Sequence, residues 1–333
     1  MPSFRKLQVH SFSSDFRGAT QIVEEPELPT PRAGHVVVQN HYVGINATDV
    51  NVTNGGYGNT TLPFGCGLEA VGVVALVAED VTDVSVGDAV AYRSLGAFAE
   101  YTEVEATKLI KTPGVSPVYV PLTVCGVSAI TALEKVGQLG TNETVLVTAA
   151  AGGTGQFVVQ LAKLAGNHVI GTCSSDDKVE YLKSLGVDRV INYTKEDIGT
   201  VLKTEYPNGV NLVFESVGGD GYKTILDNIA VHGRILIFGS VASYKGAKLE
   251  NPLLFHEVGR YIQRRSVSIR GFFMPNFAEF GPEYITKLVK LIDEGKIKAG
   301  IDPTEFKGLE GIADAIDRLY AKQNIGKMIV KLV

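Results

Sequence analysis

The sequence predicts an α/β fold that combines a doubly wound parallel sheet with a smaller β-rich domain. Residues 144–156 pass from a β-branched run into glycines and then into an amphipathic segment, the order strand, tight turn, helix. From residue 144 onward strand-like and helix-like segments alternate, whereas before residue 110 short apolar runs alternate with Gly, Pro and Asp turns. A chain of 333 residues also fits two domains, at about 100–200 residues each.

The N-terminal part is expected to be a compact β-rich domain with few helices. Its apolar runs cover residues 6–9, 36–39, 70–78, 89–92 and 97–104. Gly72 and Gly87 are expected at bends, where side chains would crowd. A helix is predicted around residues 116–136, and it leads into the glycine turn.

The second part is predicted to be a parallel sheet whose strands all end at one edge. Strands are predicted at residues 145–148, 168–172, 189–192, 211–215, 234–238 and 267–272, and helices at 154–166, 176–185, 195–205, 220–230 and 281–294. Right-handed crossovers bring the carboxyl ends of such strands together, and nucleotides bind there. A final apolar strand in the tail would return to the N-terminal domain.

The glycine turn is a candidate site for a dinucleotide pyrophosphate. Gly152 and Gly153 would let the backbone approach the ligand, Gly155 would let the helix pack closely, and the helix starting near Thr154 would offer unpaired N–H groups. The first glycine of the usual pattern is replaced by Ala150, so the match is a variant. Taken alone, the turn is explained equally well by a plain strand-to-helix connection.

The end of the second strand favours NADPH over NADH. NAD sites place a carboxylate about 20 residues past the glycines, and residues 170–175 contain none. Ser174, Ser175 and Lys178 instead offer two hydroxyls and a cation suited to a 2′-phosphate, and Tyr193 would bring a phenol to the same group. The alternative is that a serine only caps the next helix, that Lys178 is a solvated surface residue and that Tyr193 is an ordinary strand-end tyrosine.

Composition argues against several classes of partner. The net charge is −5 and no basic block occurs, which disfavours nucleic acids and anionic membranes. No apolar run approaches the ~18 residues of a membrane span, and no signal peptide is evident. The three isolated cysteines suit a reducing compartment. We expect a cytoplasmic protein, with the peroxisome as a second option from the C-terminal Lys331, Leu332 and Val333.

Six short stretches carry a resemblance to a known family. They are residues 43–49, 147–156, 169–176, 183–186, 215–219 and 271–273. Together they are similar to the zinc-independent medium-chain dehydrogenase/reductase family, in its quinone oxidoreductase and prostaglandin reductase branch. The resemblance implies a GroES-like catalytic domain over 1–121, a Rossmann NADPH-binding domain over 122–292 and a return segment over 293–333. It also implies a homodimer joined through the edges of the nucleotide-binding sheets.

The same resemblance implies a set of NADPH contacts. They are Ser174, Lys178, Tyr193, Ser216, Phe238, Tyr244, Phe272, Phe273 and Asn324. Phe272 and Phe273 would wall the nicotinamide pocket, although aromatic residues on an apolar strand are otherwise simply core.

The metal ligands of zinc-dependent relatives are missing at the matching positions. Asn46 stands where those enzymes have a cysteine, and Leu68 where they have a histidine. Cys125 matches a third ligand position, but a single thiolate cannot hold a catalytic metal, which needs about three protein ligands. We therefore expect no metal and no Lewis-acid chemistry.

The expected reaction is hydride addition to an activated C=C bond. Charge then develops on the carbonyl oxygen of an α,β-unsaturated ketone, and a hydrogen-bond donor stabilises it. Tyr244, Tyr57 and Asn46 are the candidates near the reacting groups, while both tyrosines could instead be ordinary loop residues and water could supply the proton. Asp49 and Glu69 are expected to make structural hydrogen bonds.

The predicted substrate is a hydrophobic enone, with 15-oxo-prostaglandin-like lipids as the class that the resemblance implies. The alternatives are a quinone as substrate and a non-catalytic NADPH-binding protein.

Overall fold

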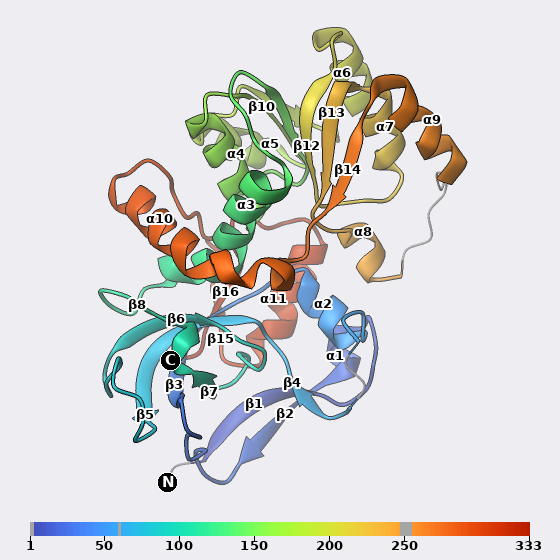
Figure 1. Ribbon diagram of the computed structural model, residues 1–333. Coiled ribbons are helices and arrows are strands. Elements are labelled where there is room, and N and C mark those ends of the chain that lie inside the picture. The colour runs from blue at the N-terminus through green and yellow to red at the C-terminus, as the bar shows by residue number, and fades with distance from the viewer. Residues whose placement is uncertain (1–2, 59–60, 247–254) are drawn as a thin grey trace. The chain divides into compact units, whose positions relative to one another are not determined.

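The computed structural model describes residues 3–58, 61–246 and 255–333, which form two compact units. The β-rich unit comprises Met1–Val124 and Gly300–Val333, and the parallel-sheet unit comprises Cys125–Ala299 (Figure 1). These divisions fall three and seven residues after the boundaries expected at 121 and 292. The C-terminal segment belongs to the same unit as the N-terminal strands.

In the part of the parallel-sheet unit that the structure describes, six parallel strands form a sheet in the order β11-β10-β9-β12-β13-β14. The strands are β9 (Thr144–Val147), β10 (His168–Cys173), β11 (Arg189–Asn192), β12 (Val210–Glu215), β13 (Ile229–Ile237) and β14 (Ser268–Gly271). The order reverses between β9 and β12, so this point is the topological switch where ligands bind in doubly wound sheets. The predicted fold class is confirmed.

Helices cover both faces of this sheet because its strands are apolar on both sides. The helices are α4 (Gly155–Leu164), α5 (Asp176–Ser184), α6 (Ile198–Glu205), α7 (Gly221–Asp227) and α9 (Phe255–Arg265). Ile170 packs in a cluster with residues of α6 and α7, whereas the next residue, Gly171, points to the opposite face, where a Cβ would lie 3.4 Å from Leu182 of α5. Successive strand residues therefore serve different helical layers.

Two helices of this unit were not predicted. The turn α8 (Val241–Tyr244) and helix α9 lie between β13 and β14, where the sequence pattern predicted only a connection. Helix α9 packs Val258 and Tyr261 against the core cluster. The parallel pairing of β13 with β14 requires a crossover of this kind. The predicted helix at 281–294 is confirmed as α10 (Gly281–Asp293), which follows a short helical segment, η5 (Met274–Phe280).

The described residues of the β-rich unit form two sheets. A three-stranded sheet has the order β2-β1-β4, formed by β2 (Thr20–Glu25), β1 (Phe4–Val9) and β4 (Phe64–Gly65). The larger sheet has the order β15-β16-β3-β5-β6-β8, and β7 also pairs with β3. Its strands are β3 (His35–Gly44), β5 (Glu69–Val77), β6 (Ala89–Arg93), β7 (Tyr101–Glu105), β8 (Leu109–Lys111), β15 (Phe306–Lys307) and β16 (Ile329–Lys331).

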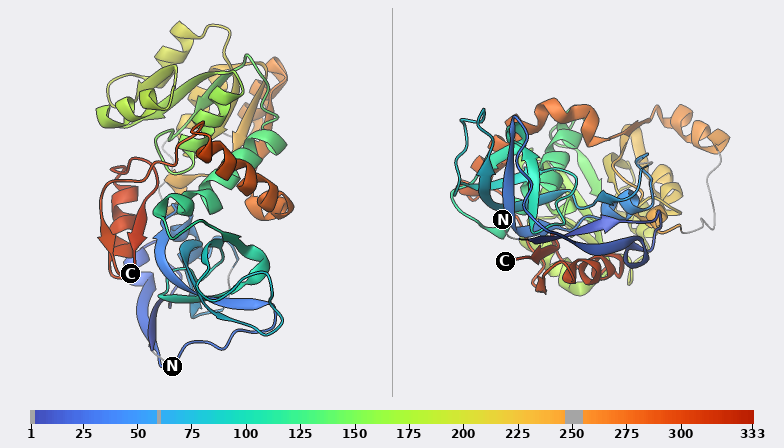
Figure 2. Two further views of the ribbon diagram at one scale, coloured as in Figure 1. Left: turned by 90° about the vertical axis from the view of Figure 1, so that its left-hand side faces the viewer. Right: turned by 90° about the horizontal axis from the view of Figure 1, so that it is seen from below.

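The C-terminal tail adds strands to this larger sheet, as predicted. Strand β16 pairs antiparallel with β3, placing Ile329 opposite Gly44, and Figure 2 shows this red segment beside the blue N-terminal strands. The apolar run over 97–104 becomes a strand only in its second half, because β7 begins at Tyr101, while Ala99 forms an isolated bridge with Lys6. The described residues of this unit also form the α-helices α1 (Phe16–Ala19), α2 (Thr48–Thr53) and α11 (Gly311–Tyr320).

Gly72 lies where two strands approach too closely for a side chain. A Cβ at this position would lie 1.9 Å from the backbone oxygen of Gln39, beside a register shift in the β3–β5 pairing. Gly87 has a positive φ of 93° in the turn before β6. Both predicted bends are confirmed, and both have a steric or conformational cause.

Helical turns cover residues 117–136, as predicted. They are η2 (Pro117–Tyr119), η3 (Leu122–Gly126), α3 (Val127–Thr131) and η4 (Ala132–Val136). Among the described residues, this stretch alone is long and apolar enough to cross a membrane, but 72% of its most apolar window is buried inside the protein. Core helices of globular proteins have this property.

Candidate functional site

The glycine turn after β9 is shaped by two close backbone approaches. A Cβ on Gly155, the first residue of α4, would lie 2.4 Å from the oxygen of Ala149, so only glycine fits there. The Gly152 N–H donates to the same oxygen over 3.0 Å. Ala149, not Ala150, takes the positive φ of 48°, and Ala150 is buried with its N–H bonded to Thr172. The position of the missing first glycine, Ala150, therefore does not take a positive φ, and it is Ala149 that adopts the left-handed conformation.

Ser174, Lys178 and Tyr193 come together at the ends of β10 and β11. The Lys178 Nζ donates to the Ser174 Oγ over 3.1 Å, and the Tyr193 N–H donates to the backbone of Cys173 over 3.0 Å. Lys178 is only 8% exposed, which excludes a solvated surface lysine. Ser175 precedes α5 but makes no side-chain capping bond, so it does not act as a conventional N-cap. The geometry agrees with a site for an anionic group.

A carboxylate lies just beyond this group, but other residues already bind it. Asp176, the first residue of α5, accepts hydrogen bonds from Lys195 over 2.6 Å and from Asn192 over 3.1 Å. The hydrogen bond from the Lys195 ammonium, and to a lesser extent that from the Asn192 amide, lowers the pKa of this exposed carboxyl. Its oxygens are held toward Lys195 and Asn192.

Ser216 and Thr148 occupy the switch point of the sheet. The Ser216 N–H donates to the Thr148 Oγ1 over 2.9 Å, and the Ser216 Oγ donates to the Thr148 carbonyl over 3.2 Å. The preceding Glu215, which sequence reasoning missed as a site residue, is buried and accepts the N–H groups of Val217 and Gly218 at 2.7 and 2.6 Å. Burial raises the pKa of Glu215, and those two N–H groups oppose that rise. Glu215 thus fixes the loop that follows β12.

Aromatic rings line up across the ends of β12, β13 and β14. The Phe214 and Phe238 centroids lie 4.8 Å apart, Phe238 and Phe272 stack at 5.4 Å, and Phe272 and Phe277 also stack at 5.4 Å. Phe273 points differently and is 45% exposed. Phe238 and Phe272 therefore belong to a packed aromatic row, and Phe273 is the exposed member of the predicted pair.

Tyr244 lies on the short helix α8 after β13. Its hydroxyl oxygen accepts the backbone N–H of Ser240 over 3.3 Å. The hydroxyl also lies 3.2 Å from where a Cβ on Gly239 would be, so Gly239 leaves room for the phenol. Tyr244 is thus held in one orientation near the carboxyl end of β13.

The β-rich unit holds a buried polar cluster around Asn46. Lys327 is 1% exposed, and its Nζ lies 2.7 Å from the Asn46 Oδ1 and 2.5 Å from the Glu69 Oε1. The Asn46 Nδ2 donates to the Glu69 Oε1 over 2.9 Å, and the Thr123 Oγ1 donates to the Glu69 Oε2 over 2.7 Å. Gly44 makes room for this carboxylate, because a Cβ there would lie 2.4 Å from the Glu69 Oε1. These contacts direct both polar atoms of the Asn46 amide toward Glu69 and Lys327.

Lys327 was not predicted as a member of this cluster. Its sequence signal is a lysine flanked by Gly326 and the apolar run that becomes β16. Residues two positions apart along an extended chain point to the same face. Lys327 lies two residues before Ile329, which packs in the core cluster with Val71 and Ala91, so the two side chains are expected on one face. The cluster therefore continues the apolar face of the larger sheet.

Asp49 completes the cluster. It is fully buried, and its Oδ2 accepts the Asn46 N–H over 2.7 Å. Its Oδ1 is the one enclosed side-chain oxygen or nitrogen among the described residues that lacks a hydrogen-bond partner. Burial raises the pKa of Asp49 from 3.8 to about 7, a rise that the Asn46 N–H and the Lys327 charge oppose. Near neutral pH this carboxyl carries a proton part of the time.

Tyr57 and Arg93 lie at the exposed margin of this cluster. The Tyr57 hydroxyl forms a hydrogen bond with that of Thr48, and the Tyr57 side chain is 44% exposed. Arg93, the last residue of β6, pairs in register with Glu69 of β5. Burial lowers the pKa of the Arg93 guanidinium, and the negative charges of the Glu69 carboxylate and of the Tyr57 phenolate act in the opposite direction. Arg93 was also not predicted.

The Asn46 cluster does not fit a zinc ion. Zinc sites need thiolate, imidazole or carboxylate ligands, and an ammonium next to the amide of Asn46 repels a cation. Leu68 offers no ligand atom, and Cys125 is a buried thiol. Over residues 3–58, 61–246 and 255–333, no three His, Cys, Asp or Glu side chains gather in a way that could hold a metal.

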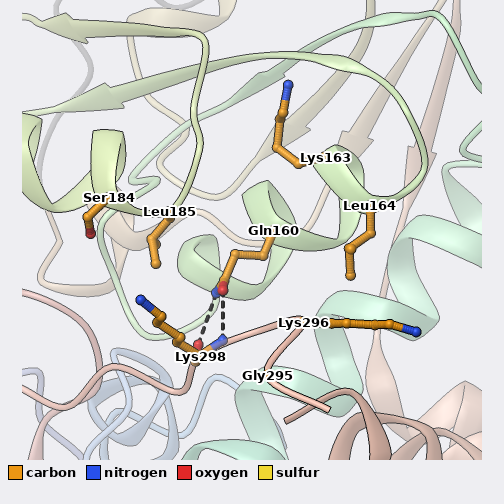
Figure 3. Close-up of a pocket in the computed structure, with 8 residues that line it drawn as sticks. All are labelled: Gln160, Lys163, Leu164, Ser184, Leu185, Gly295, Lys296 and Lys298. Atoms are coloured by element: carbon orange, nitrogen blue, oxygen red, sulfur yellow. Dashed lines mark hydrogen bonds between the residues drawn. The ribbon is translucent and has the colours of Figure 1, made fainter.

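The remaining predicted residue, Asn324, lies in the β-rich unit just before β16. Its Nδ2 donates to the Gly326 carbonyl over 3.2 Å. Figure 3 shows a depression elsewhere, on the parallel-sheet unit, that contains none of the predicted site residues. There the Gln160 amide bonds the backbone of Lys298 at 2.7 and 2.9 Å, and so ties the segment after α10 to α4.

Comparison with known proteins agrees with this division of the chain. The family model described as "Alcohol dehydrogenase GroES-like domain" matches residues 32–114, and the model "Zinc-binding dehydrogenase" matches residues 153–294. A probable quinone oxidoreductase from Leishmania amazonensis is 42% identical over 99% of this chain and 98% of its own. Prostaglandin reductase-3 from Mus musculus is 40% identical over 99% of this chain and 90% of its own.

Solved structures show the same fold over the whole length. Quinone oxidoreductase from Escherichia coli, crystallised with NADPH, has a TM-score of 0.86 at 26% identity and covers 98% of this chain and 99% of its own. Quinone oxidoreductase from Pseudomonas syringae has a TM-score of 0.85 at 29% identity, with the same coverage. The β-rich unit is thus the expected GroES-like domain and the parallel-sheet unit the Rossmann domain. The chain belongs to the medium-chain dehydrogenase/reductase family of oxidoreductases, in the branch that includes quinone oxidoreductases and prostaglandin reductases.

Proposed function

We propose that this protein reduces the C=C bond of hydrophobic α,β-unsaturated ketones with NADPH, by hydride transfer without a metal. The observation that carries the choice of cofactor is the buried Lys178–Ser174 pair at the end of β10. A cation and a hydroxyl there match the dianionic 2′-phosphate that distinguishes NADPH from NADH. The Escherichia coli relative crystallised with NADPH supports the same choice.

The residues of the parallel-sheet unit would hold the cofactor in sections. The turn from Ala150 through Gly152, Gly153 and Thr154 to Gly155 would take the pyrophosphate, because Gly155 brings the N-terminus of α4 close to it. Tyr193 would add a phenol beside the 2′-phosphate, and Ser216 with Thr148 would contact the cofactor at the switch point. When bound, NADPH supplies the hydride. Phe238, Phe272 and Phe273 would form the apolar wall near the nicotinamide, with Asn324 as a further contact.

Two tyrosines are the proposed donors to the developing enolate oxygen. The Tyr244 hydroxyl already accepts an N–H from Ser240, and accepting one hydrogen bond makes a phenol a stronger donor. Tyr57 is exposed, with its hydroxyl linked to Thr48. Asn46 would act indirectly, because its amide is turned toward Lys327 and Glu69. Water can supply the final proton, so neither tyrosine has to be an obligatory acid.

The proposed reaction uses no metal because the Lys327 ammonium occupies the position where a metal would have to bind. This ammonium lies next to Asn46, the position that resembles a zinc ligand in other relatives, and there it neutralises Glu69 in place of a metal ion. Alcohol oxidation by a Lewis acid would have no site here, whereas reduction of a polarised C=C bond needs none.

A quinone is the second candidate substrate, because relatives from Leishmania amazonensis and Pseudomonas syringae are described as quinone oxidoreductases. The products distinguish the two: an enone gives a saturated ketone, and a quinone gives a semiquinone or hydroquinone. A third candidate is a non-catalytic NADPH-binding protein. Steady-state NADPH oxidation with panels of enones and quinones separates all three. Turnover of enones supports the proposal, and tight NADPH binding without any turnover would refute it.

We also propose a homodimer joined through the edges of the nucleotide-binding sheets. In the part of the chain that the structure describes, β11 and β14 end the six-stranded sheet, and β14 is the edge chosen for the test because it pairs only with β13. Light scattering at micromolar concentration would give the mass of a dimer, and a proline placed within β14 would reduce it to that of a monomer.

A further inference from the structure

Arg93 is a cationic side chain without an anionic partner. Among the described residues no hydrogen bond or ion pair involves its guanidinium, whereas Lys327, Arg32 and Lys111 of the same unit each pair with a carboxylate. Arg93 is partly buried, and a guanidinium has five N–H donors. Since Asp49 is the one residue with an enclosed and unpartnered side-chain oxygen or nitrogen, the unpaired nitrogens of Arg93 reach solvent.

Glu69 does not neutralise Arg93, although the two are register partners on adjacent strands. Side chains of opposite residues in an antiparallel pair lie on the same face, so Arg93 stands beside Glu69. The Glu69 carboxylate, however, already accepts from Lys327, Asn46 and Thr123. The Lys327 ammonium balances its charge. The positive charge of Arg93 therefore remains for a ligand.

The surroundings of Arg93 suit the charged end of an apolar molecule. Leu95, two residues further along the chain, is 46% exposed, and Tyr57 is 44% exposed. The loop that carries Leu95 is held by hydrogen bonds from Ser94 and Gly96 to the backbone of Leu68 and Gly67, at 2.9 and 3.0 Å. The Tyr57 ring and the Arg93 guanidinium thus share the margin of the Asn46 cluster, and an exposed leucine follows two residues later in the chain. Arg binds carboxylates through two parallel N–H···O bonds.

We propose that Arg93 is a specificity-determining residue that binds a carboxylate of the substrate, so the preferred enones are apolar acids. This inference rests on the proposed function and adds the chemistry of the substrate's second group. If it holds, the protein binds an acidic enone more tightly than the neutral ester of the same enone, and Arg93 accounts for the difference in affinity.

The test compares an oxo-alkenoic acid that carries an enone with its methyl ester. The wild-type protein is measured against Arg93→Met, which keeps the apolar stem, and Arg93→Lys, which keeps the charge but loses the fork. Arg32→Met is the matched control, because Arg32 is an exposed arginine of the same unit paired with Glu103. Thermal unfolding checks that every variant is folded.

Arg93→Met is expected to raise the KM for the acid by about 10–100-fold and to leave the ester within about twofold, because a hydrogen-bonded charge contact is lost. Arg93→Lys is expected to give an intermediate KM, and Arg32→Met to change neither. Added salt should raise the KM of the wild type for the acid and have little effect on Arg93→Met.

Three results would overturn the inference. They are equal losses for acid and ester, a wild-type preference for the ester, and a raised KM for NADPH with both substrates, which would assign Arg93 to the cofactor. If the wild type reduces no enone, the proposed function fails. Calorimetric binding of the saturated acid to the NADP⁺-loaded protein then still tests Arg93, since equal affinity of wild type and Arg93→Met would refute its role.

Discussion

Replacing Lys327 with methionine should destabilise the protein far more than replacing an exposed lysine. The Lys327 ammonium and the Glu69 carboxylate are 1% and 0% exposed and lie 2.5 Å apart. Methionine keeps the apolar stem but removes the positive charge, which leaves the buried Glu69 carboxylate without its cationic partner. The Oδ1 of Asn46 loses a donor at the same time.

The expected loss follows from the cost of a buried charge without its partner. Removing one member of a buried ion pair costs about 3–5 kcal/mol of unfolding free energy. At about 2–4 °C per kcal/mol for a domain of 150–250 residues, the melting temperature should fall by roughly 6–20 °C. The change falls on the β-rich unit, which contains all the residues concerned.

Differential scanning calorimetry of wild type and variants measures this effect. Lys331→Met is the control, because Lys331 is an exposed lysine of β16, four residues further along the chain, and it should shift the melting temperature by about 2 °C or less. Adding Glu69→Gln to Lys327→Met should recover about half of the loss, since the double variant buries no unpaired charge. A loss below about 1 kcal/mol for Lys327→Met, or a double variant no more stable than the single one, would refute this account of the cluster.

Three further predictions concern the cofactor, the donor and pH. Lys178→Ala should raise the KM for NADPH at least tenfold and change that for NADH little, because only NADPH carries the 2′-phosphate; equal changes in kinetic assays would contradict that assignment. Tyr244→Phe should lower kcat by up to ~100-fold with an unchanged KM for NADPH, and an unaltered kcat would exclude this phenol as a donor. Asp49 has a folded pKa raised from 3.8 to about 7, so the folded protein binds the extra proton and its unfolding free energy falls as pH rises from about 4 to 7. Asp49→Asn keeps an acceptor for the Asn46 N–H but does not titrate. Its unfolding free energy should therefore rise relative to that of the wild type as pH increases, by at most roughly 4 kcal/mol, and urea unfolding of both proteins at pH 5 and pH 8 measures the change.

Local sequence pattern predicted the fold well because both units are built from regular periodicities. The strands and helices of the parallel-sheet unit follow from alternating apolar runs and turns, and even the return of β16 to the N-terminal sheet was predicted. Helix α9 was missed, since its apolar residues are few and its position follows from the crossover that β13 and β14 require. Only the second half of the apolar run over 97–104 forms a strand, since β7 begins at Tyr101 and Ala99 makes an isolated bridge with Lys6.

The candidate site was predicted only where it depends on local sequence. The glycine turn, Ser174 and Lys178 lie within single strand-to-helix connections, so their spacing identified them. Lys327 is 281 residues from Asn46 along the chain. It reaches the cluster because the following strand, β16, pairs with β3. Arg93 reaches Glu69 through strand register in the same way. The sequence pattern predicted that the tail strand returns to the N-terminal domain, but not which strand it pairs with or in which register.

The most direct test of the central claim follows the hydrogen that NADPH delivers. NADPH deuterated at C4 of the nicotinamide is incubated with the protein and a hydrophobic enone, and the product is analysed by mass spectrometry and NMR. The proposed function predicts a saturated ketone with one deuterium on the β-carbon. An allylic alcohol, or NADPH oxidation that occurs only with quinones, would contradict it.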